Sequence, residues 1–535
     1  MSNHFNLKNI LLLTGGIGLS LQATANDGDQ KKNFLFILTD QQQYKAMSFA
    51  GNEVLQTPNL DRLAEQGAFF TNAYTPSAVC CPARSSILTG HTIENTGMRN
   101  NDAYFDVDES LMPMPTFDEI LTAYGYHCEY YGKWHTSSHR APHVYRNPVQ
   151  YAKNGRWIFG PGGMAFMYRD YLDEHVEMPA LREGEFLENI SRFPYVPDPI
   201  DKFYGKTAEE MEEQGVRHIQ PDQHGKLRMD KEHTVTAFQA RQTIEAIERL
   251  QDTTFSITLS LHFPHSPITP AEPYYGMYPP EEMVPPVSIS DDMENSPYRN
   301  ANGRMGLPEY ADEYLIKYMI SNYYGLVAEI DHWVGEILDK LDELGLTDQT
   351  MVIFASDHGE MLGAHGMREK NVFYEESAHI PLIINFPGEI ESGTIVDGYV
   401  SLIDLFPTIL DYLGIPEHES NGISLRGLIE KTDTVHGRYV VTEWDFRGDI
   451  ESNYMILKDG WKLIIPYSAT STVLNALYDL NTDPYEMTNL IGHHPDRLQY
   501  VEKTEELRGY LLEWMYKNGS NHIQGVTERV LIDPL

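Results

Sequence analysis

The chain has 535 residues, of which 41% are hydrophobic, and its formal net charge is -38. This length is enough for one large α/β domain and a smaller one. The negative charge argues against binding to nucleic acids or to anionic membranes, so a polyanionic substrate would need a local basic pocket. The sequence contains only 3 cysteines, which excludes a disulfide scaffold.

The first 25 residues have the pattern of a secretory signal peptide. Lys8 gives a weak positive charge, residues 10–21 form a short apolar stretch, and Ala23-Thr24-Ala25 has the small residues of a cleavage site. The apolar stretch is too short for a comfortable membrane span. No cysteine precedes Cys80, which argues against a lipoprotein anchor. We therefore expect a periplasmic or secreted protein without a membrane span.

Apolar runs bounded by turn signals predict an α/β fold. Residues 33–39 are almost continuously apolar, which is typical of a strand buried on both faces of a parallel sheet. Further strands are predicted at 126–131, 255–261, 350–355 and 381–386. Capping and amphipathic patterns predict helices at 57–67, 234–250, 312–344 and 402–414. For the first of these helices, we expect Thr57 as the N-cap and Gly67 as the end.

After about residue 430 the pattern changes to short strands separated by turns. These strands are predicted at 439–442, 454–457, 461–465 and 477–480, and a closing helix at 495–516. We therefore expect a signal peptide at 1–25, a catalytic domain at 32–428 and a C-terminal subdomain at 429–535. The expected fold class is α/β: a large mixed, mostly parallel sheet flanked by helices, with a smaller antiparallel sheet and one helix after it.

Between about residues 140 and 230 the periodicity is lost, and the segment is rich in aromatic residues, Gly and Pro. We expect long loops there, of the kind that often carry specificity. The aromatic side chains offer faces that stack on sugar rings, but simple packing explains any single one of them equally well. They include Trp157, Phe159, Phe166, Tyr168, Tyr171, Tyr195 and Tyr204.

Polar groups directly follow four of the predicted strands. They are Asp40, Lys133 to His135, His262 to His265, and Asp357 with His358. Because ligands of open α/β sheets bind beyond the carboxyl ends of the strands, we expect these groups to converge at one edge. Asp40, Asp357 and the adjacent Gln41 offer hard oxygen ligands, which suit Ca²⁺ or Mg²⁺, and His358 adds a nitrogen.

The most specific motif is Cys80-x-Pro82-x-Arg84, followed by Leu88-Thr89-Gly90. Cys80 stands at the start of a predicted helix, where free backbone N–H groups favour an anion. Arg84 places a permanently charged guanidinium on the first turn. A structural cysteine beside an ordinary helix start is the simpler interpretation of Cys80, but the length of the motif argues against it.

This motif resembles the signature of type I sulfatases, and so does the segment from Thr57 to Gly67. The order of the polar groups also matches that family from about residue 33 to 490. The resemblance implies the alkaline phosphatase-like fold of the family. It also implies that Cys80 is converted to formylglycine (3-oxoalanine) by a formylglycine-generating enzyme or an anaerobic sulfatase-maturating enzyme.

The resemblance further implies catalytic roles for individual residues. The hydrated formylglycine at position 80 attacks sulfur, held in place by Arg84. His265, with Lys370, protonates the leaving sugar oxygen. His135 then takes a proton from the second hydroxyl, so that sulfate leaves by elimination. Lys133 and Lys370 help to neutralise the sulfate.

The family also holds a divalent metal, usually calcium, and the residues that match its ligands here are Asp40, Gln41, Cys80, Asp357 and His358. Many members have Asp where Gln41 stands and Asn where His358 stands. The metal is therefore left open between Ca²⁺ and Mg²⁺. The residues expected to bind substrate are His262, His365, Arg368 and Lys370.

The sequence thus predicts a secreted bacterial sulfatase that acts on a sulfated carbohydrate. An algal polysaccharide such as ulvan or carrageenan is the first expectation, and a host glycosaminoglycan the second. One alternative is a phosphonate monoester or phosphodiester hydrolase of the same superfamily. The other is an inactive sulfated-glycan-binding protein. The presence of every expected polar residue argues against this second alternative. Cys81 and Cys128 are expected to be buried free thiols, with a bridge between them as the alternative.

Overall fold

The structure is a computed structural model, and it describes most of the chain from Lys32 onward. The predicted signal peptide lies outside the described residues, as does most of the aromatic segment at 140–230. Among the described residues, no helix combines the length and the apolar character needed to cross a membrane. The described residues are 32–101, 110–137, 168, 171–172, 174–176, 197–198, 225–227, 229–299, 313–433, 438–444 and 453–533.

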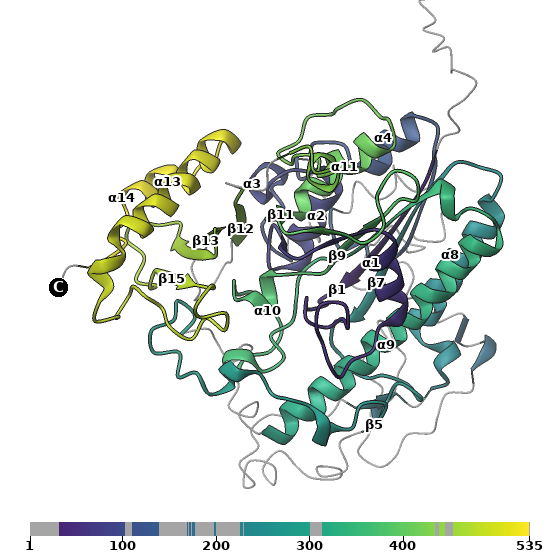
Figure 1. Cartoon of the computed structure of the whole chain (residues 1–535), viewed down its shortest axis with the longest axis horizontal. Coiled ribbons are helices and arrows are strands. Elements are labelled where there is room, and N and C mark those ends of the chain that lie inside the picture. The colour runs from purple at the N-terminus through teal and green to yellow at the C-terminus, as the bar shows by residue number, and fades with distance from the viewer. Residues whose placement is uncertain are drawn as a thin grey trace, which may run out of the picture. The chain divides into compact units, whose positions relative to one another are not determined.

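The main sheet has seven strands in the order β10-β2-β9-β8-β1-β7-β4. Figure 1 labels β1, β7 and β9 of this sheet. Its middle strand β1 pairs in parallel with β7 and β8, and β4 continues the parallel pairing beyond β7. Only β9 runs antiparallel to its neighbours. The strands are β1 (Asn33–Asp40), β2 (Ala68–Phe70), β4 (His127–Gly132), β7 (Phe255–Pro264), β8 (Thr350–Ser356), β9 (Leu382–Asn385) and β10 (Thr394–Val396).

Both faces of this sheet are buried under helices. Leu35 and Ile37 of β1 pack with α1 (Pro58–Gln66), α8 (Val235–Leu250) and α9 (Glu313–Glu343). Phe34 and Phe36, which alternate with them, pack with α2 (Cys80–Thr89), α4 (Phe117–Ala123) and α11 (Leu405–Tyr412). Because successive side chains of a strand point to opposite faces, a strand covered on both sides must be apolar throughout. This explains the continuous apolar run of β1.

Helix α1 begins in a way that the sequence did not predict. Thr57 is the N-cap residue, but its side chain does not cap the helix. The carboxylate of Asp331, on α9, accepts hydrogen bonds from the backbone N–H groups of Asn59 (3.0 Å) and Leu60 (2.8 Å) instead. Two otherwise unpaired N–H groups of the helix end are thus satisfied by a residue 271 positions away. Gly67 ends the helix as expected.

A second, four-stranded sheet follows near the C-terminus, with the order β12-β13-β14-β15 and antiparallel pairing throughout. Its strands are β12 (Val440–Trp444), β13 (Asn453–Lys458), β14 (Trp461–Pro466) and β15 (Ala476–Asp479). One face packs on α13 (Val501–Asn518). The expected fold class is therefore confirmed, whereas the domain boundaries at 428 and 429 stay a prediction.

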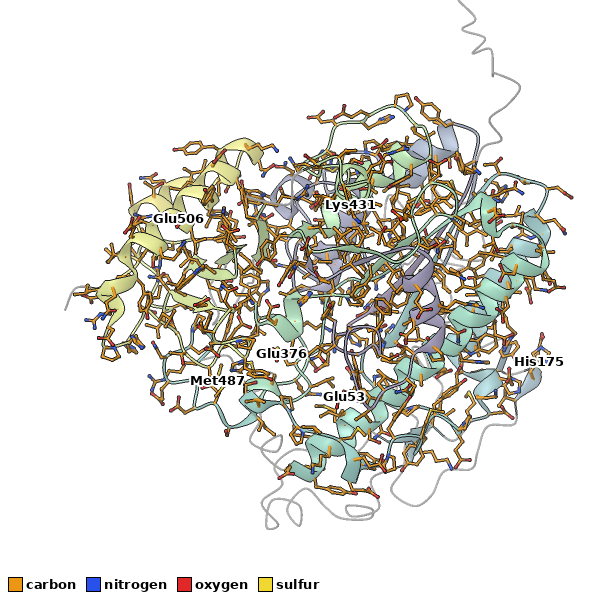
Figure 2. The ribbon with its side chains drawn as sticks, in the orientation of Figure 1. Glu53, His175, Glu376, Lys431, Met487 and Glu506 are labelled. Atoms are coloured by element: carbon orange, nitrogen blue, oxygen red, sulfur yellow. The ribbon has the colours of Figure 1, made fainter. Side chains whose placement is uncertain are left out.

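Lys462 of β14 connects this second sheet to α10 (Glu375–Ala378), on which Figure 2 labels Glu376. The ammonium of Lys462 is fully buried and lies 2.7 Å from both Glu375 and Glu486. It also donates to the backbone oxygen of Phe373 at 2.8 Å. Three donors thus meet three acceptors, which is the condition under which a buried charge is tolerated.

The remaining short elements connect these layers. Tyr168 and Tyr171, from the aromatic segment, pack against Phe238 of α8, so both are packing residues here. Cys81 and Cys128 are buried free thiols, as expected. The other elements are α3 (Ile93–Thr96), α12 (Arg426–Ile429), α14 (Ile523–Glu528), β3 (Ala73–Tyr74), β5 (Pro197–Asp198), β6 (Lys226–Leu227) and β11 (Val400–Ser401).

Candidate active site

Polar side chains meet where β8, β1, β7 and β4 end, side by side in the main sheet. Asp40 is the last residue of β1, and Asp357 directly follows β8. Lys133 directly follows β4, and His262 lies near the end of β7. All four are buried. The parallel pairing brings together at this edge the groups that the sequence placed after four separate strands.

Cys80 is the first residue of α2 and lies within this cluster. Its Sγ is 3.0 Å from Nε2 of His358 and 3.8 Å from Oδ1 of Asp40. One ligand atom each from Cys80, Asp40, Asp357 and His358 lie within 4.8 Å of one another, and all four residues are buried. Carboxylate oxygens beside an imidazole and a reactive side chain make a donor set that fits a divalent cation.

His358 presents its free electron pair to this centre. Its Nδ1 lies 3.0 Å from the backbone oxygen of Gly359, which accepts but cannot donate. In the neutral ring Nδ1 therefore carries the proton, and Nε2, which faces Cys80, is the ligand atom. The backbone N–H of His358 donates to Oδ1 of Asp357 at 2.9 Å, which keeps the two ligand residues together.

Arg84 holds the two carboxylates of the donor cluster. Its Nε donates to Asp357 at 2.7 Å and its Nη2 to Asp40 at 3.2 Å. Its Nη1 donates to Oγ of Ser260 and to the backbone oxygen of Lys133. These contacts use four of the five N–H groups of Arg84, and its expected contact with hydrated formylglycine at position 80 stays a prediction. Because the fork is rigid, it fixes both carboxylates at once.

Two cations lie against the reacting position. Lys133 is fully buried and pairs with Oδ2 of Asp40. Burial alone would raise the pKa of Asp40, but Lys133 and Arg84 hold it well below its ordinary value. Burial and Asp40 oppose ionisation of the Cys80 thiol. Lys133 and Lys370 outweigh both and lower the pKa of this thiol.

Lys370 bridges the metal-binding side of the site and the histidines. Its Nζ lies 2.8 Å from Nε2 of His265 and donates to Oε1 of Gln41. The ring of His262 lies beside that of His265, with 5.3 Å between the centroids. Burial, and next to it Lys370, lowers the pKa of His265 well below its ordinary value. His265 is therefore neutral near pH 7.

His135 is also buried and neutral. Its backbone has a φ of 40°, in the left-handed region that non-glycine residues seldom adopt. Burial, followed by Lys133 and Arg84, lowers the pKa of His135 well below its ordinary value. A neutral imidazole can accept a proton, so this state is the one that a base requires.

His365 and Arg368 lie on the segment that precedes Lys370. The ring of His365 stacks on Tyr374, with 3.8 Å between the centroids, and its Nδ1 lies 2.6 Å from Asp291. Arg368 is largely buried, and its Nη2 atom lies 3.6 Å from Oε1 of its neighbour Glu369. Their expected substrate contacts stay a prediction, as does that of His262.

Two residues of the site were not assigned from the sequence. Ser260 connects Arg84 to the end of β4, because its hydroxyl donates to the backbone oxygen of Lys133 at 2.7 Å. The sequence offered one sign of this role: Ser260 is a polar residue within an apolar strand, two positions before His262. Glu360 is buried and accepts from the side chain of Gln41 and from the backbone N–H of Glu369. Its place in the Asp357-His358-Gly359-Glu360 sequence was visible, but not its partners.

Two family models match the chain. The model described as sulfatase matches residues 32–415, and the one described as N-sulphoglucosamine sulphohydrolase, C-terminal, matches residues 363–513. The first covers the main sheet and every residue of the site. The second covers the segment with Lys370 and the second sheet.

Curated relatives and solved structures agree with these matches. An arylsulfatase of Clostridium perfringens is 27% identical, over 92% of this chain and 98% of its own. An ulvan-active sulfatase of Formosa agariphila is 28% identical, over 87% of this chain and 78% of its own. Among solved structures, the phosphonate monoester hydrolase of Silicibacter pomeroyi superposes with a TM-score of 0.73 at 22% identity, over 92% of this chain and 97% of that one.

Because the sequence identity to the phosphonate hydrolase is low, the structural likeness shows only that the two proteins share a fold. The sulfatase model, by contrast, matches the larger part of the chain and includes the segment with Cys80. The chain therefore belongs to the sulfatase family and is a sulfuric ester hydrolase.

Proposed function

We propose that this sulfatase removes sulfate from a sulfated carbohydrate and uses a formylglycine made from Cys80. The observation that carries the proposal is the position of Cys80, 3.0 Å from His358 and within the same donor cluster as Asp40 and Asp357. A nucleophile made at residue 80 lies against a cation-binding site and two lysines. Such preorganised positive charge is usually the largest contribution to catalysis at anionic centres.

The residues present fit Ca²⁺, with Mg²⁺ as the alternative. Asp40, Asp357, His358 and residue 80 form the donor cluster, and we assign the side-chain oxygen of Gln41, which accepts from Lys370, as a further hard ligand. When bound, the cation supplies a Lewis acid for the sulfate oxygens, and formylglycine supplies a hydroxyl nucleophile in its hydrated form. Arg84 keeps Asp40 and Asp357 in place for this purpose.

The chain's own side chains supply the remaining charge and proton transfers. Lys133 and Lys370 lie on the reacting centre and neutralise the sulfate oxygens. His265, 2.8 Å from Lys370, shares with it the proton that the leaving sugar oxygen needs. His135, neutral and buried, accepts the proton when sulfate is released.

A polysaccharide such as ulvan or carrageenan is the proposed substrate, ahead of a glycosaminoglycan. The similarity to an ulvan-active sulfatase supports the first class, and the match to the N-sulphoglucosamine sulphohydrolase model supports the second. The signal-peptide pattern of residues 1–25 supports action in the periplasm or outside the cell, where such polymers are degraded. Maturation by a formylglycine-generating or an anaerobic sulfatase-maturating enzyme is part of the same proposal.

A phosphonate monoester or phosphodiester hydrolase is the second candidate. The observation in its favour is the fold shared with the phosphonate monoester hydrolase of Silicibacter pomeroyi. Both reactions need a metal, a nucleophile and cations around a tetrahedral anion, so the fold does not separate them. Binding of sulfated glycans without catalysis is the third candidate, and the complete set of site residues speaks against it.

Mass spectrometry of the peptide around Cys80 is the first test, on protein produced together with a maturating enzyme. We expect the mass decrease that accompanies replacement of the thiol by an aldehyde. The matured protein is then assayed on sulfated ulvan and carrageenan oligosaccharides, on heparan oligosaccharides, and on phenyl phosphonates. Faster turnover of phosphonates than of any sulfate ester would favour the second candidate. An unmodified Cys80 in protein without turnover would favour the third.

A further inference from the structure

Glu360 takes no part in the reaction described above, yet it is buried close to the residues proposed to bind the metal. The residue is 1% exposed, and in the sequence it stands shortly after Asp357 and His358. Its carboxylate accepts hydrogen bonds from the Nε2 group of Gln41 and from the backbone N–H groups of Leu362 and Glu369. A buried carboxylate with three N–H donors is held in one orientation.

Each polar group of Gln41, in the backbone and in the side chain, makes a hydrogen bond. Its backbone N–H donates to Oδ1 of Asp357 at 3.1 Å, and its backbone oxygen accepts from the hydroxyl of Tyr323 at 2.7 Å. Its side-chain NH₂ faces Glu360 and its side-chain oxygen faces Lys370. The backbone φ of 71° is held against the usual preference of a non-glycine residue.

The orientation of the Gln41 amide matters because its two ends are chemically opposite. The carbonyl oxygen accepts hydrogen bonds and can ligate a hard cation, whereas the NH₂ group only donates and repels one. A flipped amide would occupy the same volume but present NH₂ to Lys370 and to the cation. An aspartate at position 41, as in many sulfatases, has two equivalent oxygens and does not face this choice.

We propose that Glu360 is a positioning residue that selects the metal-binding orientation of the Gln41 amide. An ionised Glu360 only accepts, so it favours the amide orientation that points NH₂ toward itself and the oxygen toward Lys370, where we place the cation-facing side of Gln41. By accepting from the N–H of Glu369, the same carboxylate fixes the backbone next to Lys370. This inference rests on the proposed metal site and deepens it.

The role can be separated from a general effect of charge. Removing any carboxylate near a cation lowers its affinity, whatever the amide does. The test therefore compares Glu360→Gln in two backgrounds, the native protein with Gln41 and the Gln41→Asp variant. A charge effect is similar in both backgrounds, but loss of amide orientation affects only the protein that has an amide.

Calcium affinity is measured by isothermal titration calorimetry on the full, matured chain. In the native background we expect Glu360→Gln to weaken calcium binding about tenfold, as is usual for residues that orient metal ligands. In the Gln41→Asp background the same change should have a clearly smaller effect. Glu369→Gln, which removes a neighbouring carboxylate that does not touch Gln41, serves as the charge control, and any loss of calcium affinity that it causes should be the same in both backgrounds.

For Glu360→Gln, an equal loss of affinity in both backgrounds, or no loss in the native one, would overturn the proposal. So would a native protein that binds no calcium. Gln41→Glu replaces Gln41→Asp if circular dichroism shows the latter to be unfolded, because its carboxylate is also symmetric. Sulfate ester turnover is assayed separately. A failure of the proposed function would therefore appear as absent turnover in a protein whose calcium affinities still follow the expected pattern.

Discussion

The Nζ atom of Lys370 lies 2.8 Å from the Nε2 atom of His265, and this contact determines which of the two carries the proton. An ammonium only donates, so Nε2 accepts. Nδ1 of His265 lies 2.7 Å from the backbone oxygen of Ser266 and therefore carries the ring proton. In the resting site the transferable proton thus resides on Lys370, and His265 is the group through which it is directed.

This arrangement predicts that the effect of His265→Ala depends on the leaving group. A sugar alkoxide needs a proton as it departs, whereas a nitrophenolate does not. We expect kcat on a sugar sulfate to fall about 10²- to 10⁴-fold, and kcat on an aryl sulfate with an acidic leaving group to fall much less. Steady-state kinetics on both substrates measure the difference.

Cys81→Ala is a matched control, because Cys81 occupies an unspecified position of the motif, is buried, and does not belong to the donor cluster. It should leave the ratio of the two kcat values unchanged. Equal losses on both substrates for His265→Ala would contradict a role in leaving-group protonation and would indicate a role in binding or orientation.

Calcium should stabilise the folded protein through Asp357. A ligand that binds only the native state at 100 times its Kd adds about 2.7 kcal/mol to the free energy of unfolding. We expect calcium to raise the thermal midpoint of the native protein, and a chelator to lower it. Asp357→Asn should remove this response. Asp348→Asn, which changes an exposed residue just before β8, should retain it. A calcium response that survives Asp357→Asn would place the cation elsewhere.

Lys462→Met should strongly destabilise the protein. The change leaves the half-buried Glu375 and the buried Glu486 side by side without the ammonium that lies 2.7 Å from each. Removing one member of a buried ion pair typically costs about 3–5 kcal/mol. Equilibrium unfolding in urea measures the loss. Lys503→Met, which breaks an exposed pair with Glu506, should cost less than about 1 kcal/mol.

The double variant Lys462→Met with Glu486→Gln tests the reason for this loss. Burial, followed by the neighbouring Glu375, raises the pKa of Glu486 to about 7, although Lys462 opposes the shift. Neutralising Glu486 should therefore restore part of the stability lost in Lys462→Met. If the double variant is no more stable than the single one, loss of packing rather than uncompensated charge is responsible.

Glu329 on α9 should make stability depend on pH. Burial raises its pKa from 4.5 to about 7, although a hydrogen bond from Thr234 opposes the shift. The folded state thus holds the proton more tightly than the unfolded state. The stability from this group is fully present below pH 4.5 and is lost as the pH rises through 7.

Glu329→Gln imitates the protonated form and should remove this dependence. At pH 8 we expect the variant to be more stable than the native protein, by at most about 3 kcal/mol for a shift of this size. Urea unfolding at several values between pH 5 and 8 measures the two slopes. Glu336→Gln, on the exposed side of the same helix, should leave the native slope unchanged. Parallel slopes for native protein and Glu329→Gln would refute the assignment.

Much of the fold follows from local patterns in the sequence. The apolar run at 33–39 became β1, and the helix pattern at 312–344 became α9. The convergence of Asp40 and Asp357 was also foreseeable, because parallel strands end at one edge of a sheet. These features depend on periodicity and on a general rule of topology, so one sequence is sufficient to predict them.

Contacts between distant segments were not foreseeable. Asp331 supplies acceptors at the start of α1, where the local sequence pointed to Thr57. The pairing of Arg84 with both Asp40 and Asp357 was not visible in the motif around Cys80. Glu360 stood in a conspicuous motif, yet its partner Gln41 lies 319 residues earlier. Residue type and spacing limit what a side chain can do, but the tertiary fold decides which partner it meets.

The central position of β1 also has a consequence for biosynthesis. Among the described strands β1 is synthesised first, but both of its neighbours, β7 and β8, are made much later, and Asp357 follows its partner Gln41 by 316 residues. Folds dominated by such distant pairings form slowly and expose apolar strands meanwhile. The nascent chain therefore needs chaperone protection until β8 has been synthesised, and a truncated product that ends before residue 350 contains no assembled centre.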